Sequence, residues 1–165
     1  MKTLIIYTSR TGFTKKYVDY LSSEIDADVK ELSGDINVSG YDTIIFASWI
    51  YAARLKKLIW LDNHNLENKN VIVLAVGITN QPCQIDVFLE DIEARGYKAF
   101  FLTGGLDYNR LGFIDKRVIK MISKSYLKEV NISIEDEIYA KKILTSFDDT
   151  NKEQLQPVIN YLTSL

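Results

Sequence analysis

The fold is decided by residues 3–14, which read Thr-Leu-Ile-Ile-Tyr-Thr-Ser-Arg-Thr-Gly-Phe-Thr. The apolar residues 4–7 predict a short buried strand that leads directly into a hydroxyl-rich turn. Helical spacing then begins, because apolar residues recur three or four positions apart at Tyr17, Val18, Leu21 and Ile25. We therefore expect a strand, a polar loop and a helix in immediate succession.

The polar loop carries groups that suit a phosphate. Ser9, Thr11 and Thr14 supply hydroxyls, and Gly12 lets the backbone approach a ligand closely. The first N–H groups of the following helix have no intrahelical acceptor, and the helix dipole favours an anion there. The alternative is an ordinary turn in which Ser9 or Thr11 only caps the helix. The stretch by itself leaves both interpretations open.

Length and composition restrict the class of protein. The chain has 165 residues, of which 47% are hydrophobic and 25% charged, as in a soluble globular domain. Its net charge of −2 predicts no nucleic-acid partner. The single cysteine, Cys83, cannot form an internal disulfide, and the apolar run 71–76 is too short to cross a bilayer. We expect one cytoplasmic domain over residues 1–165, with at most peripheral membrane contact.

Strand-like and helix-like segments alternate along the rest of the chain. Further strands are predicted over residues 29–32, 43–47, 71–76 and 99–102. Helical spacing separates them, including a helix over 55–61, and an added segment at about 106–145 precedes a last helix. This alternation predicts a doubly wound parallel α/β sheet with helices on both faces.

Two further loops at the carboxyl ends of strands have residues that suit a flat ligand, and such sheets bind ligands at that edge. The loop after the third strand contains Ser48, Trp49, Ile50, Tyr51 and Ala52. A ring system can stack on Trp49 or Tyr51, unless Trp49 only caps the core and Tyr51 only lies on the surface. The loop after the fourth strand, with amide and backbone groups that suit the edge of a heterocycle, contains Gly77, Ile78, Thr79 and Asn80.

The polar loop, the aromatic loop and the amide loop together resemble the flavodoxins, most closely at Ser9-x-Thr11-Gly12-x-Thr14. The resemblance implies a flavodoxin-like, five-stranded sheet of order 2-1-3-4-5 and bound flavin mononucleotide (FMN). It implies that the phosphate is held by Ser9, Arg10, Thr11, Gly12, Phe13 and Thr14. It also implies that the loops at 48–52 and 77–81 flank the isoalloxazine ring, with Gly105 completing the cofactor site. Ala52 stands near a position where the family commonly has a glycine.

The stretch that follows the fifth strand is similar to one flavodoxin-like branch, the menaquinone-dependent protoporphyrinogen IX dehydrogenases. The residues that fall on the pattern of that branch are Gly105, Leu106, Tyr108, Arg110, Asp115, Ile119 and Ile122. The chain departs from the branch at residues 50–52, where Ile-Tyr-Ala replaces Arg-Tyr-Gly, and at 79–83. The resemblance implies an electron carrier that serves a redox partner protein or a quinone, or an enzyme whose substrate is a porphyrinogen.

Residues 113–128 have the spacing of an amphipathic helix. Between Arg110 and Lys128 there are six basic residues and one acidic residue. Such a helix can contact an anionic membrane or attract a carboxylate-bearing substrate such as a porphyrin. The alternative is a surface helix that packs its apolar face on the sheet. A flavodoxin fold that binds no flavin and acts only through this helix also remains open.

A metal site is not expected, because the only histidine, His64, lies between Asn63 and Asn65. We expect His64 to be exposed in a turn. The acidic cluster at 135–137 has no second cluster at ligand spacing and is expected to be a solvated helix face.

Overall fold

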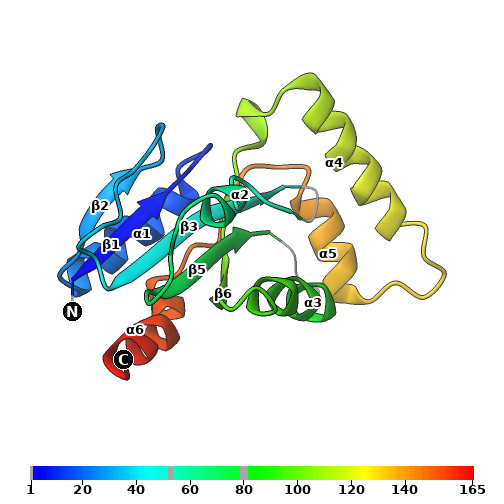
Figure 1. Cartoon of the computed structure of the whole chain (residues 1–165). Coiled ribbons are helices and arrows are strands. Elements are labelled where there is room, and N and C mark those ends of the chain that lie inside the picture. Colours follow the sequence, from blue (N-terminus) through cyan, green and yellow to red (C-terminus); the bar gives the residue numbers. More distant parts are fainter. Residues whose placement is uncertain (1, 52–53, 79–81) are drawn as a thin grey trace. The chain divides into compact units, whose positions relative to one another are not determined.

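A computed structural model describes residues 2–51, 54–78 and 82–165 (Figure 1). The chain divides into two compact units. One unit consists of Met1–Gly104 and Thr150–Leu165, and we call it the sheet unit. The other consists of Gly105–Asp149, and we call it the helical unit.

The sheet unit is built on a parallel sheet of strand order β2-β1-β3-β5-β6. These strands are β1 (Thr3–Tyr7), β2 (Asp28–Glu31), β3 (Thr43–Tyr51), β5 (Asn70–Gly77) and β6 (Lys98–Thr103). In the register, Leu4 of β1 lies opposite Ile44 of β3, which in turn lies opposite Val71 of β5. The predicted order 2-1-3-4-5 of the five parallel strands is confirmed. A short strand that was not predicted, β4 (Arg54–Leu55), pairs antiparallel with the end of β3.

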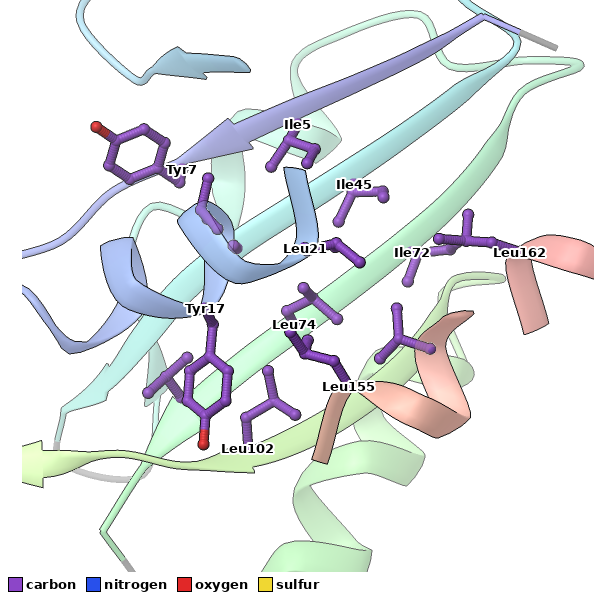
Figure 2. Close-up of a cluster of buried hydrophobic side chains, with 14 residues drawn as sticks. Ile5, Tyr7, Tyr17, Leu21, Ile45, Ile72, Leu74, Leu102, Leu155 and Leu162 are labelled. Atoms are coloured by element: carbon purple, nitrogen blue, oxygen red, sulfur yellow. The ribbon is translucent and has the colours of Figure 1, made fainter. Parts of the chain in front are cut away.

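The central strands are buried on both faces, which explains their continuous apolar sequence. On one face, Ile5, Ile45 and Leu74 pack with α1 (Phe13–Glu24) and α6 (Gln156–Thr163), as Figure 2 shows. On the other face, a second apolar cluster joins the sheet to α2 (Ile59–Asp62) and α3 (Pro82–Glu93). Helices therefore cover both faces, as predicted.

The helix expected over 55–61 is wrong for its first half. Leu55 belongs to β4, and α2 is a single turn that begins at Ile59. Two hydrogen bonds hold the chain against β3 instead: the Ser48 hydroxyl donates to the Lys56 carbonyl at 2.6 Å, and the Lys56 N–H donates to the Trp49 carbonyl at 3.0 Å. Apolar spacing cannot distinguish this hairpin from a helix, because the backbone pairing is made with another strand.

The expectation that His64 is exposed is also wrong. Its imidazole stacks on Trp60 with ring centroids 3.9 Å apart, and its side chain is only 20% exposed. Nδ1 lies 2.6 Å from the Trp60 carbonyl and Nε2 lies 2.9 Å from the Asp35 carboxylate. The ring thus links α2 to the loop before β3. Within the described ranges no group of three or more His, Cys, Asp and Glu side chains is placed to hold a metal ion.

Tyr17 joins the two chain segments that form the sheet unit. Its ring is fully buried in the apolar cluster between the sheet and helices α1 and α6 (Figure 2). Its hydroxyl donates to the Thr103 carbonyl at 2.6 Å. The same hydroxyl accepts a hydrogen bond from the Asn151 N–H at 3.1 Å. Beside it, the Gln154 side chain of the 3₁₀ turn η2 (Lys152–Leu155) accepts from the Thr103 N–H at 2.8 Å. The points where the chain leaves and re-enters the sheet unit are therefore tied to α1.

We expect Tyr17→Phe to lower the free energy of unfolding by about 1–3 kcal/mol, because it leaves the Asn151 N–H and the Thr103 carbonyl without this partner. Urea denaturation measures the loss. Tyr20→Phe removes a hydroxyl from the exposed side of the same helix, and its effect should stay within about 0.5 kcal/mol. Equal effects of the two substitutions would contradict the linking role of Tyr17.

The helical unit contains two helices, one at the predicted position 113–128 and one that includes the acidic cluster at 135–137. A pair of short antiparallel strands, β7 (Gly105–Leu106) and β8 (Phe147–Asp148), brings its ends together. Between them lie the 3₁₀ turn η1 (Tyr108–Arg110), α4 (Phe113–Tyr126) and α5 (Ile134–Lys142). The acidic cluster at 135–137 occupies the first turn of α5, behind the cap residue Ser133, where the helix dipole favours negative charge.

The two helices pack against each other (Figure 1). Ser123 of α4 and Ala140 of α5 are buried, and the rings of Tyr126 and Tyr139 meet edge to face with centroids 5.4 Å apart. Packing of the apolar residues of α4 on a core was one of the two open interpretations, but two of these residues are strongly exposed: Ile114 is 73% and Met121 66% exposed.

The helical unit should lose stability in alkali because of Tyr139. Burial, with a smaller contribution from Tyr126, raises the pKa of Tyr139 from 10.0 to about 12. The unfolded chain thus releases this proton first, so the contribution of Tyr139 to stability is constant below pH 10 and is lost as the pH rises from 10 to about 12. Denaturation followed at increasing pH measures this loss. Tyr139→Phe should make the fall shallower, and an unchanged curve would contradict the assignment to Tyr139.

Candidate functional site

The polar loop between β1 and α1 folds around the hydroxyl of Ser9. Its Oγ accepts hydrogen bonds from the Gly12 N–H at 3.2 Å and the Lys15 N–H at 3.4 Å. Gly12 is the N-cap residue of α1, with a left-handed φ of 95°, and no side chain caps the helix at this position. A Cβ on Gly12 would meet no atom within 4 Å, so the space beside the loop is open. Ser9, which lies three residues before the N-cap residue Gly12, therefore holds the loop in place through these two hydrogen bonds.

The other residues of the loop differ in exposure. Arg10 is exposed, Thr11 and Phe13 are half-buried, and Thr14 is buried. The loop is fixed to the sheet at its start, where the Thr8 N–H donates to the Ala47 carbonyl of β3 at 3.0 Å. On the first turn of α1, the hydrogen bond to the Asp19 carboxylate raises the pKa of Lys15. No acidic residue lies in that first turn.

The predicted aromatic loop is the end of a strand. Residues 48–51 continue β3, and Ile50 and Tyr51 pair with Leu55 and Arg54 of β4. Trp49 and Tyr51 are half-buried, and their rings meet at 73° with centroids 5.8 Å apart. Ser48 is fully buried, and its hydroxyl is used within this hairpin. The hairpin holds two aromatic rings together at the carboxyl edge of the sheet.

Two cations lie beside the aromatic rings of the hairpin, and one of them, Arg10, comes from the polar loop. The Arg10 guanidinium lies 5.7 Å from the centroid of the Trp49 ring. The Lys56 ammonium lies 5.7 Å from the same ring and 4.7 Å from the Tyr51 ring. Such cation–π contacts are attractive and place positive charge beside both rings. Arg10 was among the predicted site residues, whereas Lys56 was missed because its segment was interpreted as a helix.

Two glycines allow the ends of β5 and β6 to approach the same edge. A Cβ on Gly77 would lie 2.8 Å from Phe101 Cε2 and 3.1 Å from Ile50 Cδ1. A Cβ on Gly104 would lie 2.8 Å from Val76 Cγ1, and the Gly104 N–H donates to the Gly77 carbonyl at 2.6 Å. Gly104 was not predicted, although the Gly-Gly pair at the end of β6 was a usable signal.

The remaining predicted site residues lie in different parts of the chain. Ile78 follows β5 and is half-buried. Ala52, Thr79 and Asn80 lie outside the described residues. The expectation about the missing glycine at Ala52 therefore stays a prediction. Gly105 belongs to the helical unit, where β7 pairs it with Asp148. The structure thus brings together the polar loop, Trp49, Tyr51 and Gly77 within the sheet unit.

This open, parallel α/β sheet with strand order β2-β1-β3-β5-β6 belongs to the doubly wound class of folds, whose ligands bind outside the carboxyl ends of the strands. A family model described as flavodoxin domain matches residues 4–132, and the chain belongs to this family. A comparison with curated proteins yields no match.

Solved structures give three further similarities. A protein from Bacteroides uniformis, provisionally named a flavoprotein, is 18% identical over 62% of this chain and 90% of its own, with a TM-score of 0.51. Oxidised flavodoxin 2 from Bacillus cereus is 20% identical, covering 87% of this chain and 93% of its own, with a TM-score of 0.47. A Lactobacillus acidophilus flavoprotein in complex with FMN is 23% identical, covering 62% and 91%, with a TM-score of 0.47.

Proposed function

We propose that the chain binds FMN at the carboxyl edge of its sheet and transfers electrons through the bound flavin. The observation that carries the proposal is the contact between Arg10 and Trp49, which joins a phosphate-binding type of loop to an aromatic pair. Membership of the flavodoxin domain family supports the same ligand. Either half of the site alone would suit many ligands, but together they match a molecule with an anionic end and a flat ring.

The polar loop fits the phosphate of FMN. The first intrahelical acceptor of α1 is the Gly12 carbonyl, which binds the Lys16 N–H, so the amides of Phe13 and Thr14 have no partner within the helix. The space beside Gly12 is open, and the first turn carries no carboxylate that would repel an anion. These groups would hold the phosphate by amide hydrogen bonds and by the helix dipole.

The aromatic hairpin fits the ring of FMN. Trp49 and Tyr51 offer flat apolar surface at the site, and stacking adds about 0.5–1.5 kcal/mol to simple burial. When bound, the flavin supplies the capacity to accept and release one or two electrons. The charges of Arg10 and Lys56 lie beside these rings and would favour the more electron-rich, reduced flavin.

A titration with FMN tests this proposal. Binding should shift the flavin absorbance and quench its fluorescence, and reduction of the complex should be reversible in a redox titration. Riboflavin, which lacks the phosphate, serves as the matched ligand and should bind more weakly. A chain that neither shifts nor quenches added FMN would exclude the proposed function.

A second candidate, oxidation of protoporphyrinogen with a quinone acceptor, is favoured by the sequence of residues 105–122. Arg110, one of the residues that match that branch, ends η1 with its Nε 3.3 Å from Asp107 and remains 75% exposed at its side chain. An exposed guanidinium suits the carboxylates of a porphyrin. Assay of protoporphyrinogen oxidation by the FMN-loaded protein, with a quinone present, separates this enzyme from an electron carrier.

A further inference from the structure

The exposed side of α4 carries an apolar row and a basic row next to each other. The apolar row consists of Ile114, Val118, Met121 and Ile122. The basic row consists of Arg117, Lys120 and Lys124, and continues into Lys128 just after the helix. We call these eight residues the α4 face. At 100° per residue, each row follows one side of the helix, and the rows are adjacent.

The α4 face is distinct from the side of the helix that packs. Ile119, Ser123 and Tyr126 recur at helical spacing and are buried or half-buried. Tyr126 contacts Tyr139 of α5. In contrast, Ile114 and Met121 are 73% and 66% exposed, and Val118 and Ile122 are 37% and 36% exposed. The apolar row is therefore surplus to the core of the helical unit.

Charge distinguishes this surface from an ordinary exposed helix. In the part of the chain that the structure describes, none of the four cations of the basic row forms an ion pair with a carboxylate. The segment from Arg110 to Lys128 carries six basic residues and one acidic residue, within a chain of net charge −2. Positive charge is thus concentrated beside exposed aliphatic side chains.

We propose that the α4 face binds the surface of an anionic lipid bilayer, with α4 lying in the interfacial plane. The apolar row would enter the boundary between headgroups and acyl chains, and the lysines would extend toward the phosphates. A single convex helix suits a fluid, flat surface, because lipids need no matching groove. No described helix is long and apolar enough to cross a bilayer.

The electrostatic part of this binding has a characteristic size. Each lysine or arginine near an anionic membrane surface raises the affinity about fivefold at low salt. Removing two cations should therefore weaken binding about 25-fold. The inference does not depend on flavin binding, because no residue of the α4 face belongs to the proposed FMN site.

Flotation of the full chain with vesicles tests the proposal. Vesicles of phosphatidylcholine alone are compared with vesicles in which phosphatidylcholine and phosphatidylglycerol are present in equal amounts. Both kinds of vesicle are tested at low and at high salt. Lys120→Gln with Lys124→Gln tests the basic row, and Ile114→Ser with Met121→Ser tests the apolar row. Lys30→Gln with Lys152→Gln and the single variant Val87→Ser are matched controls, because they change exposed residues on the sheet unit.

We expect binding to the anionic vesicles only, weakened by salt and by both double variants but unchanged in the controls. Circular dichroism of each variant verifies that it folds. The proposal would be overturned if the unchanged chain does not bind the anionic vesicles at low salt. It would also be overturned if the double variants bind these vesicles as well as the controls do. Size-exclusion chromatography gives a further decisive outcome: a dimer that Ile114→Ser with Met121→Ser dissociates, without vesicle binding, would assign the face to a second copy of the chain. Binding of an acidic polypeptide such as polyglutamate but not of vesicles would equally overturn it.

Discussion

Gly12→Val is expected to lower the affinity for FMN by roughly 5- to 150-fold, because a β-branched residue in the left-handed region costs about 1–3 kcal/mol. The loop can escape this strain only by leaving the conformation in which Ser9 Oγ accepts from the Gly12 and Lys15 N–H groups. That change would reorient the amides proposed to hold the phosphate. Titration of FMN fluorescence measures the loss of affinity.

Gly40→Val is the matched control for this experiment. Gly40 also has a positive φ, of 85°, and a Cβ at this position would meet no atom within 4 Å. It lies before β3, at the opposite edge of the sheet. Both variants should lose similar stability, but only Gly12→Val should lose FMN affinity. Riboflavin should bind equally to Gly12→Val and to the unchanged chain. Undiminished FMN binding by Gly12→Val would remove the polar loop from the site.

Trp49→Ala is expected to weaken the binding of both FMN and riboflavin by roughly 10- to 100-fold, because the isoalloxazine ring of either ligand loses a stacking surface and buried apolar area. The same change removes the contacts that Arg10 and Lys56 make with the indole. The expected pattern differs from that of Gly12→Val, since the phosphate is not involved. Titration with the two ligands in parallel therefore distinguishes the ring end of the site from the phosphate end.

Trp49→Phe is the conservative variant and should retain most of the affinity. It keeps an aromatic ring beside Tyr51 and the half-buried position at the end of β3. Equal losses in Trp49→Phe and Trp49→Ala would point to a hairpin that has unfolded. Unchanged affinity in Trp49→Ala would place the flavin elsewhere than on this side chain.

Much of the fold could be predicted from the order of the segments. The apolar strands and the apolar spacing of α1, α3 and α6 are local patterns, and the parallel sheet follows from their alternation. The hairpin of β3 and β4 and the packing of the two helices of the helical unit against each other could not be predicted in the same way. Leu55 has the same apolar character in a helix as in β4, and the choice between them depends on its pairing with Ile50 and on the hydrogen bonds that Lys56 makes with Ser48 and Trp49.

The sequence by itself determined the strand–loop–helix element at residues 3–14 and the sheet it starts, because the signals for them lie within a few positions of one another. Only the tertiary structure decided that Lys56 and Arg10 lie over Trp49, and that Gly104 bonds Gly77. It also decided that the apolar row of α4 remains exposed. These features depend on which residues, distant in the sequence, become neighbours in the fold. The periodicity of a sequence predicts that one face of a helix is apolar, but it does not predict which residues pack against that face.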